Sequence, residues 1–191
     1  MKLVIASGNP GKLREIRAIL GSKFEEIVSM KEAGITHETV EDGATFLENA
    51  QKKAREIAEI SGCAALADDS GLCVDALGGD PGIYSARFCG RHGDDEANNR
   101  LLIQKLQGQE NRAAHYECAV SLVFPDGREL HALGSLEGQI VDLPKGEGGF
   151  GYDPYFFLPA YGKTAAEIPA EEKNRISHRA KALFALLDQL S

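Results

Sequence analysis

The chain lacks any apolar run long enough to cross a membrane, because every run falls well short of the roughly 18 residues that a spanning helix needs. The apolar stretch nearest the start covers only residues 3–6, and the turn formers Asn9, Pro10 and Gly11 follow it closely. That pattern does not predict a secretory signal peptide. We therefore expect no membrane partner.

The sequence also lacks a cysteine-based metal motif. Its four cysteines, Cys63, Cys73, Cys89 and Cys118, show none of the C-x-x-C spacing typical of zinc sites. Cys63, Cys73 and Cys118 lie in or beside apolar stretches, which favours their being small core residues. Unpaired core cysteines are typical of a reducing compartment, so we expect a cytoplasmic protein.

The chain has fewer basic than acidic residues. Lys and Arg number 21 against 29 Asp and Glu, which gives a formal net charge of −8. Such a surface repels nucleic-acid polymers and anionic membranes. A small polyanion can still bind where several basic side chains converge.

Repeats, low-complexity tracts and linkers are absent as well. At 191 residues, 43% hydrophobic and 26% charged, the chain is expected to form one domain, residues 1–191, with two lobes. A chain of this size buries about 70% of its unfolded surface, so it needs no disulfides.

Apolar periodicity and turn signals predict alternating helices and strands in the first half and an antiparallel hairpin in the second. Thr45 and Glu48 form a capping-box pattern, and Gly62 ends the helix that follows. The expected strands are residues 2–6, 26–29, 64–67, 72–75, 114–124, 129–138 and 155–158. The expected helices are residues 10–20, 46–61, 94–106, a brief one after Thr164 and a last one opening at Ser177. The fold class is therefore α/β, a mixed sheet flanked by helices, with two lobes and a substrate cleft between them.

The turn at residues 7–12 joins the first strand to the first helix. Backbone N–H groups and the helix dipole favour an anion at such a place, and Lys12 suggests phosphate. It is not a P-loop, because Ala6 and Leu13 stand where that motif has Gly and Ser or Thr. The alternative is an ordinary capped helix with Asn9 as N-cap and Pro10 at the first helical position.

Acidic side chains suggest a metal site. Asp68 and Asp69 follow an apolar strand. Adjacent side chains of an extended chain point to opposite faces, which predicts different roles for the two carboxylates. Glu41 lies in an irregular stretch and could share a hard cation with Asp69, since Mg²⁺ takes one or two carboxylates plus phosphate oxygens. The alternatives are a polar turn at Asp68 and Asp69 and a solvated acidic loop at Glu41.

Basic residues supply candidate ligands for a polyanion. Lys53 lies on the second expected helix and Lys173 near the last one. His178 and Arg179 occupy the first turn of the last helix, where positive charge opposes the macrodipole. Residues that go against the local preference of their position are typical of functional sites. The alternative is that His178 and Arg179 are a surface pair without a role.

The stretch 148–154 is an aromatic loop flanked by glycines. Glycine allows the backbone to approach a ligand closely. Phe150 or Tyr152 offers a flat face for a base to stack on, and Asp153 could cap a turn or hold a ligand hydroxyl. The alternative is a loop whose aromatic side chain fills the core.

Six stretches together resemble the inosine triphosphate pyrophosphatase family, whose members are also called Ham1-like. They are residues 7–12, 45–50, 67–72, 78–87, 148–154 and 177–180. They follow the family's order and spacing over residues 3 to about 187, and the combination is specific although no single motif is. The resemblance implies Mg²⁺-dependent hydrolysis of dITP, ITP or XTP to the monophosphate and pyrophosphate, by a homodimer.

The resemblance also implies residue roles. The triphosphate loop would comprise Ser7, Gly8, Asn9, Pro10, Gly11 and Lys12, with Lys53 as a second phosphate contact. Glu41 and Asp69 would hold Mg²⁺ with Asp68 beside them, and Asp69 would also be the catalytic base. Ser70 would touch the nucleotide. The base pocket would comprise Phe150, Gly151, Tyr152, Asp153, Lys173, His178 and Arg179.

Three other functions stay open. A Maf-like pyrophosphatase would act on modified pyrimidine triphosphates, and a phosphatase would release orthophosphate. A nucleotide-binding sensor would do no chemistry, but the carboxylates Glu41, Asp68 and Asp69 argue against it, because binding alone needs no base.

Overall fold

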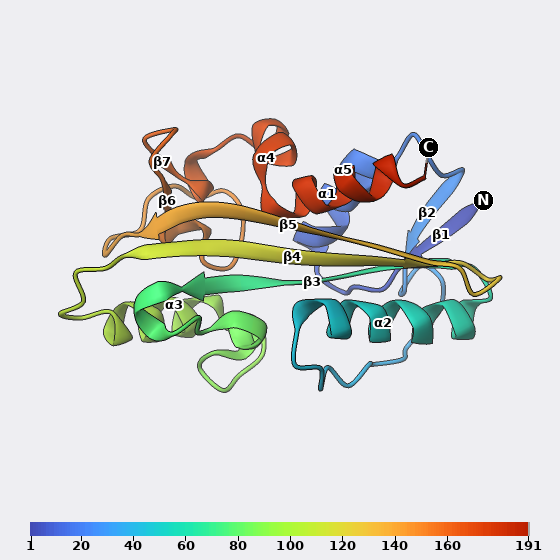
Figure 1. The fold of residues 1–191 in the computed structure, drawn as a ribbon, viewed down its shortest axis with the longest axis horizontal. Helices are drawn as coiled ribbons and strands as arrows, with labels where there is room; N and C mark the ends of the chain where they lie inside the picture. Colours follow the sequence, from blue (N-terminus) through green and yellow to red (C-terminus); the bar gives the residue numbers. More distant parts are fainter. Residues whose placement is uncertain (191) are drawn as a thin grey trace. The chain divides into compact units, whose positions relative to one another are not determined.

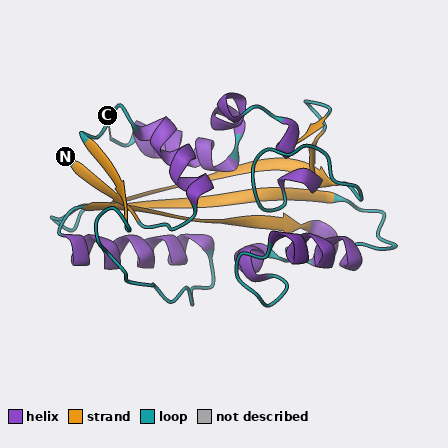
Figure 2. Ribbon diagram, turned by 180° about the vertical axis from the view of Figure 1, so that it is seen from behind, coloured by secondary structure: helices purple, strands orange, loops and turns teal. Residues whose placement is uncertain are grey.

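The computed structural model describes residues 1–190 as a mixed sheet with helices packed on it (Figures 1 and 2). The strands are β1 (Lys2–Ile5), β2 (Glu26–Ser29), β3 (Ala64–Val74), β4 (Ala113–Val123), β5 (Glu129–Ile140), β6 (Phe156–Leu158) and β7 (Lys163–Thr164). The α-helices are α1 (Pro10–Leu20), α2 (Phe46–Ser61), α3 (Asp95–Lys105), α4 (Ala170–Ile176) and α5 (His178–Asp188). Four 3₁₀ turns are η1 (Asp75–Leu77), η2 (Gly82–Arg87), η3 (Asp153–Tyr155) and η4 (Ala165–Glu167).

The strand order is β2-β1-β3-β4-β5-β6-β7. β1 pairs in parallel with β2 and β3, whereas β6 pairs antiparallel with β5 and β7. The predicted fold class, a mixed α/β sheet flanked by helices, is confirmed. Within the described residues, no helix is both long and apolar enough to span a membrane.

The chain forms two compact units. The first comprises Met1–Asp69, Cys118–Gly134 and the stretch from His178 onward, and the second comprises Ser70–Glu117 and Ser135–Ser177. The long strands β3, β4 and β5 each contribute residues to both.

The first unit has two apolar cores, because side chains alternate along β1. Leu3 and Ile5 pack with apolar residues of α1 and α5, while Val4 packs with Ala54 and Ile57 of α2. Figures 1 and 2 agree that α2 covers one face of these strands and α1 and α5 the other. This layering brings the first turns of α1 and α5 to the same side of β3.

The second unit has a core of its own. Leu72 of β3, Leu102 of α3, Tyr116 of β4 and Phe156 of β6 belong to one buried cluster. The rings of Tyr116 and Phe156 lie 4.4 Å apart at their centroids. The cluster holds α3 and the short strand β6 against the longer strands β3, β4 and β5.

Local signals predicted the helix ends well. Asn9 caps α1, Thr45 caps α2 by accepting a hydrogen bond from Glu48 N at 3.1 Å, and Gly62 ends α2 with φ 62°. The capping box at Thr164 is present and opens η4. The predicted hairpin is confirmed by β4, β5 and the turn in which Gly127 N donates to Phe124 O at 3.0 Å.

Two predictions were wrong in detail, and two short elements were missed. The break at residues 68–71 does not exist, because β3 runs unbroken from Ala64 to Val74 with Asp68 and Asp69 inside it. Cys63 and Cys73 are half-buried, so only Cys118 is the core residue that we expected. The helix α4 and the strand β7 were not predicted, since both are short and weakly patterned.

Candidate active site

Asp68 and Asp69 stand next to each other in β3 and turn to different partners. Asp68 Oδ2 lies 3.0 Å from Lys12 Nζ and accepts a hydrogen bond from Arg179 Nε at 3.1 Å. Asp69 Oδ2 instead accepts a hydrogen bond from Asn49 Nδ2 at 2.9 Å. Neighbouring residues in a strand point to opposite faces, so the predicted division of roles has a geometric basis.

Lys12 extends from the first turn of α1, and the turn before it is hydrogen-bonded internally. Asn9 Oδ1 accepts from Gly11 N at 2.8 Å and from Lys12 N at 3.2 Å, and Ser7 Oγ accepts from Asn9 N at 3.2 Å. The ordinary capped helix, which was the alternative interpretation of this stretch of sequence, is therefore present. Attraction for an anion in this turn comes from the Lys12 ammonium and the helix dipole.

Arg179 is a buried cation. Its side chain is 2% exposed, and besides Asp68 it pairs with Glu15 of α1 through Nη1. Burial by itself would raise the pKa of Asp68, but the positive charges of Lys12, Arg179 and Lys53 outweigh burial and hold that pKa below its usual value. Asp68 is therefore an ionised carboxylate that fixes two cations.

Lys53 of α2 lies beside the second carboxylate. Its Nζ donates to the backbone oxygen of Asp68 at 2.9 Å and lies 3.2 Å from Glu41 Oε2 and 3.9 Å from Asp69 Oδ1. The single Lys53 ammonium group thus lies within ion-pair distance of both the Glu41 and the Asp69 carboxylate. Burial raises the pKa of Asp69, the charges of Lys53 and Lys12 oppose that rise, and Glu41 adds to it.

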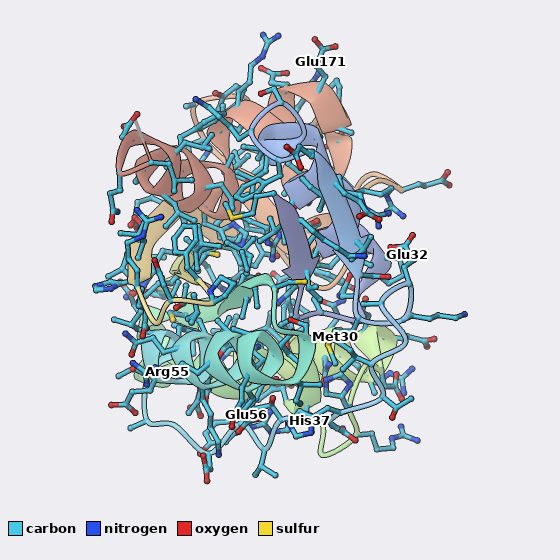
Figure 3. All side chains as sticks on the ribbon, turned by 90° about the vertical axis from the view of Figure 1, so that its right-hand side faces the viewer. Met30, Glu32, His37, Arg55, Glu56 and Glu171 are labelled. Carbon is cyan, nitrogen blue, oxygen red and sulfur yellow. The ribbon has the colours of Figure 1, made fainter. Side chains whose placement is uncertain are left out.

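The irregular segment that carries Glu41 is fastened to α2. His37 Nε2 lies 2.7 Å from Glu56 Oε2, and Thr39 Oγ1 donates to the same oxygen at 2.6 Å. Figure 3 shows His37 below the helix that carries Arg55 and Glu56. Close to Glu41, Gly43 N donates to Asn49 Oδ1 at 2.8 Å, so Asn49 holds both this segment and Asp69.

The carboxylates fit a hard cation as a pair. Glu41 and Asp69 already share the positive charge of Lys53, and carboxylate oxygens are the ligands that Mg²⁺ prefers. Asp68 is occupied by Lys12 and Arg179. Among the described residues, Glu41, Asp68 and Asp69 do not bring three ligand oxygens within 4.8 Å of one another.

The predicted aromatic loop lies in the second unit, where Asp153 anchors it. The Asp153 carboxylate accepts hydrogen bonds from Phe150 N at 3.0 Å, Tyr116 Oη at 3.0 Å and Lys173 Nζ at 2.6 Å. Lys173 Nζ also lies 5.0 Å from the centroid of the Phe150 ring. Asp153 is 3% exposed, so its carboxylate organises the loop from inside.

The two aromatic candidates in this loop differ in burial. Tyr152 is buried in the core of the second unit, and its hydroxyl donates to Ser85 O at 2.7 Å. Phe150 is half-buried and keeps part of its ring surface exposed. Phe150 is therefore the side chain with a face available for stacking.

The structure divides the predicted site residues between the two units. The first unit contains Ser7, Gly8, Asn9, Pro10, Gly11, Lys12, Glu41, Lys53, Asp68, Asp69, His178 and Arg179, and the second contains Ser70, Phe150, Gly151, Tyr152, Asp153 and Lys173. His178 is 7% exposed and begins α5 beside Arg179.

Four further residues position this site and were not singled out from the sequence. Glu15 pairs with Arg179, and Asn49 holds Asp69. In the second unit, Asp95 Oδ2 accepts from Gly151 N and Asn99 Nδ2 donates to Gly151 O, each at 2.9 Å. Asn49 lies within the recognised stretch 45–50, whereas the other three carry no local signal.

A cavity of about 630 Å³ lies elsewhere in the first unit. It extends from Lys2 and Val4 of β1 past residues 33–37 to Ser61 and Cys63 at the end of α2. It includes no predicted site residue, and of the side chains described above for the site only His37 lines it.

Known proteins match this chain over its whole length. The family model described as the Ham1 family matches residues 3–189. A protein named dITP/XTP pyrophosphatase from Nitrosomonas europaea is 50% identical over 100% of this chain and 94% of its own length. One of the same name from Thermus thermophilus is 50% identical over 98% of this chain and 91% of its own length.

Solved structures agree with that match. The Ham1 protein of Staphylococcus aureus superposes with a TM-score of 0.88 at 39% identity, covering 100% of this chain and 98% of that one. A HAM1 protein from Coxiella burnetii gives a TM-score of 0.89 at 37% identity with the same coverage. The resemblance identified from the six motifs is confirmed, and the chain belongs to the Ham1 family.

Proposed function

We propose that this chain hydrolyses the purine nucleoside triphosphates dITP, ITP and XTP to the monophosphate and pyrophosphate. Relatives that carry the name dITP/XTP pyrophosphatase are about half identical to it over nearly its full length. The observation that carries the proposal is the Lys53 ammonium within reach of Glu41 and Asp69, next to the pair of Lys12 and Asp68. The lysines of this group suit the phosphates of a polyphosphate, and its carboxylates suit a metal ion and an attacking water.

The triphosphate binds to the basic side chains of the first unit. Lys12 and Lys53 are 16% and 12% exposed, so their charges are partly desolvated and act more strongly than they would in water. Ser7, Gly8 and Gly11 shape the turn that leads to Lys12. Asp68 holds Lys12 through their 3.0 Å ion pair, and Arg179 holds Asp68 in turn, which makes both of them positioning residues in this proposal.

Asp69 is the general base. A water attacks the α-phosphorus, its proton passes to an Asp69 oxygen, and the bond from the α-phosphorus to the bridging oxygen breaks so that pyrophosphate leaves. Burial raises the pKa of Asp69, which makes it a better proton acceptor than an ordinary carboxylate. Asn49 fixes one of its oxygens by a hydrogen bond of 2.9 Å.

Mg²⁺ would be held by Glu41 and Asp69, and when bound it would neutralise charge on the phosphate oxygens and the leaving pyrophosphate. The Lys53 ammonium already places one positive charge beside both carboxylates. In this proposal Lys53 turns to the phosphates of the substrate and leaves that place to the ion. Asp68 is not among the ligands that we propose, because two cations already occupy it.

Recognition of the base is proposed for the second unit and the start of α5. Phe150 stacks on the purine, Lys173 and His178 approach its edge, and Ser70 contacts the nucleotide. Hypoxanthine and xanthine carry a keto oxygen at C6, where adenine carries an amino donor. A site that offers donors there leaves them unpaired with ATP, and such mismatches give discrimination of about 10⁴. GTP shares the keto oxygen, so it must be rejected at its 2-amino group.

A substrate panel tests the proposal. The protein is incubated with Mg²⁺ and ITP, dITP, XTP, GTP or ATP, and both pyrophosphate and orthophosphate are measured. We expect pyrophosphate from ITP, dITP and XTP. Equal rates of pyrophosphate release from ATP and ITP would contradict the proposal. Orthophosphate as product would identify a phosphatase, and binding without product would identify a sensor. A second panel of modified pyrimidine triphosphates tests for a Maf-like enzyme, which would turn them over.

We further propose that the protein acts as a homodimer in the cytoplasm. The four cysteines are free, which suits a reducing compartment. Sedimentation equilibrium at several protein concentrations tests the dimer, and a monomer at all of them would contradict it.

A further inference from the structure

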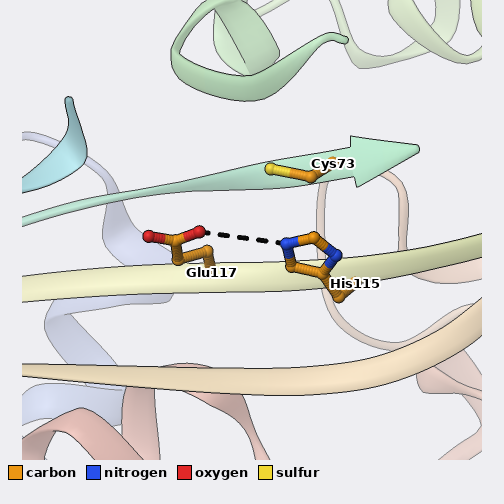
Figure 4. Close-up of side chains that lie close together, drawn as sticks. All are labelled: Cys73, His115 and Glu117. Carbon is orange, nitrogen blue, oxygen red and sulfur yellow. Dashed lines mark ion pairs between the residues drawn. The ribbon is translucent and has the colours of Figure 1, made fainter. Parts of the chain in front are cut away.

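Three side chains of different chemistry meet on the sheet of the second unit. Cys73 of β3 and His115 and Glu117 of β4 each offer one ligand atom, and these atoms all lie within 4.8 Å of one another. Figure 4 shows the three side chains close together, with the nearest nitrogen of the His115 ring facing the Glu117 carboxylate and the Cys73 sulfur above them on β3. His115 Nε2 lies 3.8 Å from Glu117 Oε2.

The two strands fix this arrangement. Side chains alternate along a strand, and β3 and β4 are neighbours in the sheet. On β4, Ala114 and Tyr116 are buried in the core of the second unit, which leaves His115 and Glu117 on the opposite face. On β3, Leu72 and Val74 are buried in the same core, so Cys73 shares that face.

Thiolate sulfur, imidazole nitrogen and carboxylate oxygen are the three ligand types of protein zinc sites. Zinc–ligand bonds of roughly 2.0–2.3 Å in tetrahedral geometry place the ligand atoms about 3.3–3.8 Å apart. The distance between His115 and Glu117 already meets that requirement. Cys73 needs at most a shift of about 1 Å, which rotation of side chains supplies.

We propose that Cys73, His115 and Glu117 form a second metal site, for a divalent cation that accepts thiolate, such as Zn²⁺, with its fourth position open to water. Mg²⁺ does not suit this site, because it prefers an octahedron of oxygen ligands. All three ligands belong to the second unit, whereas Glu41 and Asp69 belong to the first. The site links two strands and is separate from the hydrolysis proposed above.

An ion can reach the three ligands. The side chains of His115 and Glu117 are 32% and 38% exposed, and Cys73 is half-buried. Burial raises the pKa of the Cys73 thiol to about 11, and the negative charges of Glu117 and Asp75 add to the rise. Binding therefore releases the thiol proton, as is usual for zinc on cysteine. The same carboxylates attract the cation.

Cobalt provides the test, because Co²⁺ replaces Zn²⁺ in such sites and a cobalt–thiolate bond gives a charge-transfer absorption band in the near ultraviolet. The full-length protein is reduced, freed of metal and titrated with Co²⁺. We expect the band to appear with one Co²⁺ per chain, to disappear on adding Zn²⁺, and to persist in excess Mg²⁺.

Variants assign the ligands. Cys73→Ser should abolish the band, while Cys89→Ser, which removes another half-buried thiol of the same unit, should leave it unchanged. His115→Ala and Glu117→Gln should each weaken Co²⁺ binding by at least about tenfold, the loss seen even for residues that only support a ligand. Circular dichroism checks that each variant is folded.

The proposal is overturned if no band appears, if Cys73→Ser retains it, or if Cys89→Ser loses it. The readout is absorption rather than turnover. A protein that binds Co²⁺ at Cys73 but fails to hydrolyse ITP would therefore contradict only the proposed function, and the reverse result would contradict only the metal site.

Discussion

Arg179 and Asp68 are 111 residues apart in the sequence, and Arg179 Nε donates to Asp68 Oδ2 at 3.1 Å inside the first unit. Both side chains are almost completely buried, and Lys12 Nζ lies 3.0 Å from the same carboxylate oxygen. Buried charges are tolerated only when they are paired. Asp68 therefore connects the first turn of α5 to the first turn of α1.

Removing the charge of Asp68 should destabilise the fold. Asp68→Asn leaves Lys12 and Arg179 without their shared partner, and breaking a buried pair costs about 3–5 kcal/mol. Urea unfolding at pH 7 measures the loss. The matched control is Asp42→Asn, whose side chain is 67% exposed in its pair with Lys52, and it should change stability little.

The effect of Asp68 should also depend on pH. The folded-state pKa of Asp68 lies below the ordinary value of 3.8. Its charge therefore stabilises the fold above pH about 4, and this stabilisation is lost as the pH falls from there toward the folded-state pKa. The difference in unfolding free energy between wild type and Asp68→Asn should shrink over that range, and a constant difference would contradict the assignment.

Asp69→Asn should abolish most turnover without weakening the fold. Loss of a general base costs about 10²–10⁴ in kcat. The folded-state pKa of Asp69 is raised above 3.8, so its ionised form opposes folding at neutral pH and this penalty disappears as the pH falls through that pKa. We expect the variant to equal or exceed wild type in unfolding free energy at pH 7. Wild-type kcat, or a clear loss of stability, would argue against the assigned role.

Phe150→Ala should weaken nucleotide binding. Stacking of one base on an aromatic side chain is worth about 1–3 kcal/mol, which corresponds to a rise in KM of about 5- to 150-fold. Phe150→Tyr keeps the flat face and should restore most of the affinity. Tyr161→Ala removes an aromatic side chain that is 40% exposed in the same unit, and it should leave KM unchanged.

Gly149→Ala should disturb the same loop through Asp153. A Cβ at Gly149, where φ is +72°, would clash with Asp153 Oδ2, the oxygen that accepts from Phe150 N and Lys173 Nζ. Gly162→Ala introduces a similar backbone strain at φ +62° with nothing within 4 Å. Gly149→Ala should therefore raise KM for ITP, whereas Gly162→Ala should cost only stability. Equal KM values in the two variants would contradict the role of Asp153.

The site was predictable from sequence to different degrees. Lys12 and Asp69 lie in two of the recognised stretches, whereas Lys53 and Glu41 were singled out by their charge and by what the resemblance implies. The structure brings these four into the same unit. Arg179 stood out as a cation that opposes its helix dipole, and its two carboxylate partners explain how that position is tolerated. Glu15 and Asn99 gave no signal, because their roles depend on partners 164 and 52 residues away.

The sequence by itself determined the family and the ends of the helices. Asn9, Thr45 and Gly62 act on backbone groups within a few residues, so their patterns predict structure without knowledge of the rest of the chain. Only the tertiary structure decided that β3 continues through Asp68 and Asp69, since lysine, arginine and asparagine side chains from distant elements satisfy those carboxylates. Only it placed Cys73 beside His115 and Glu117, because the pairing of two strands far apart in the chain depends on the packing of the whole second unit.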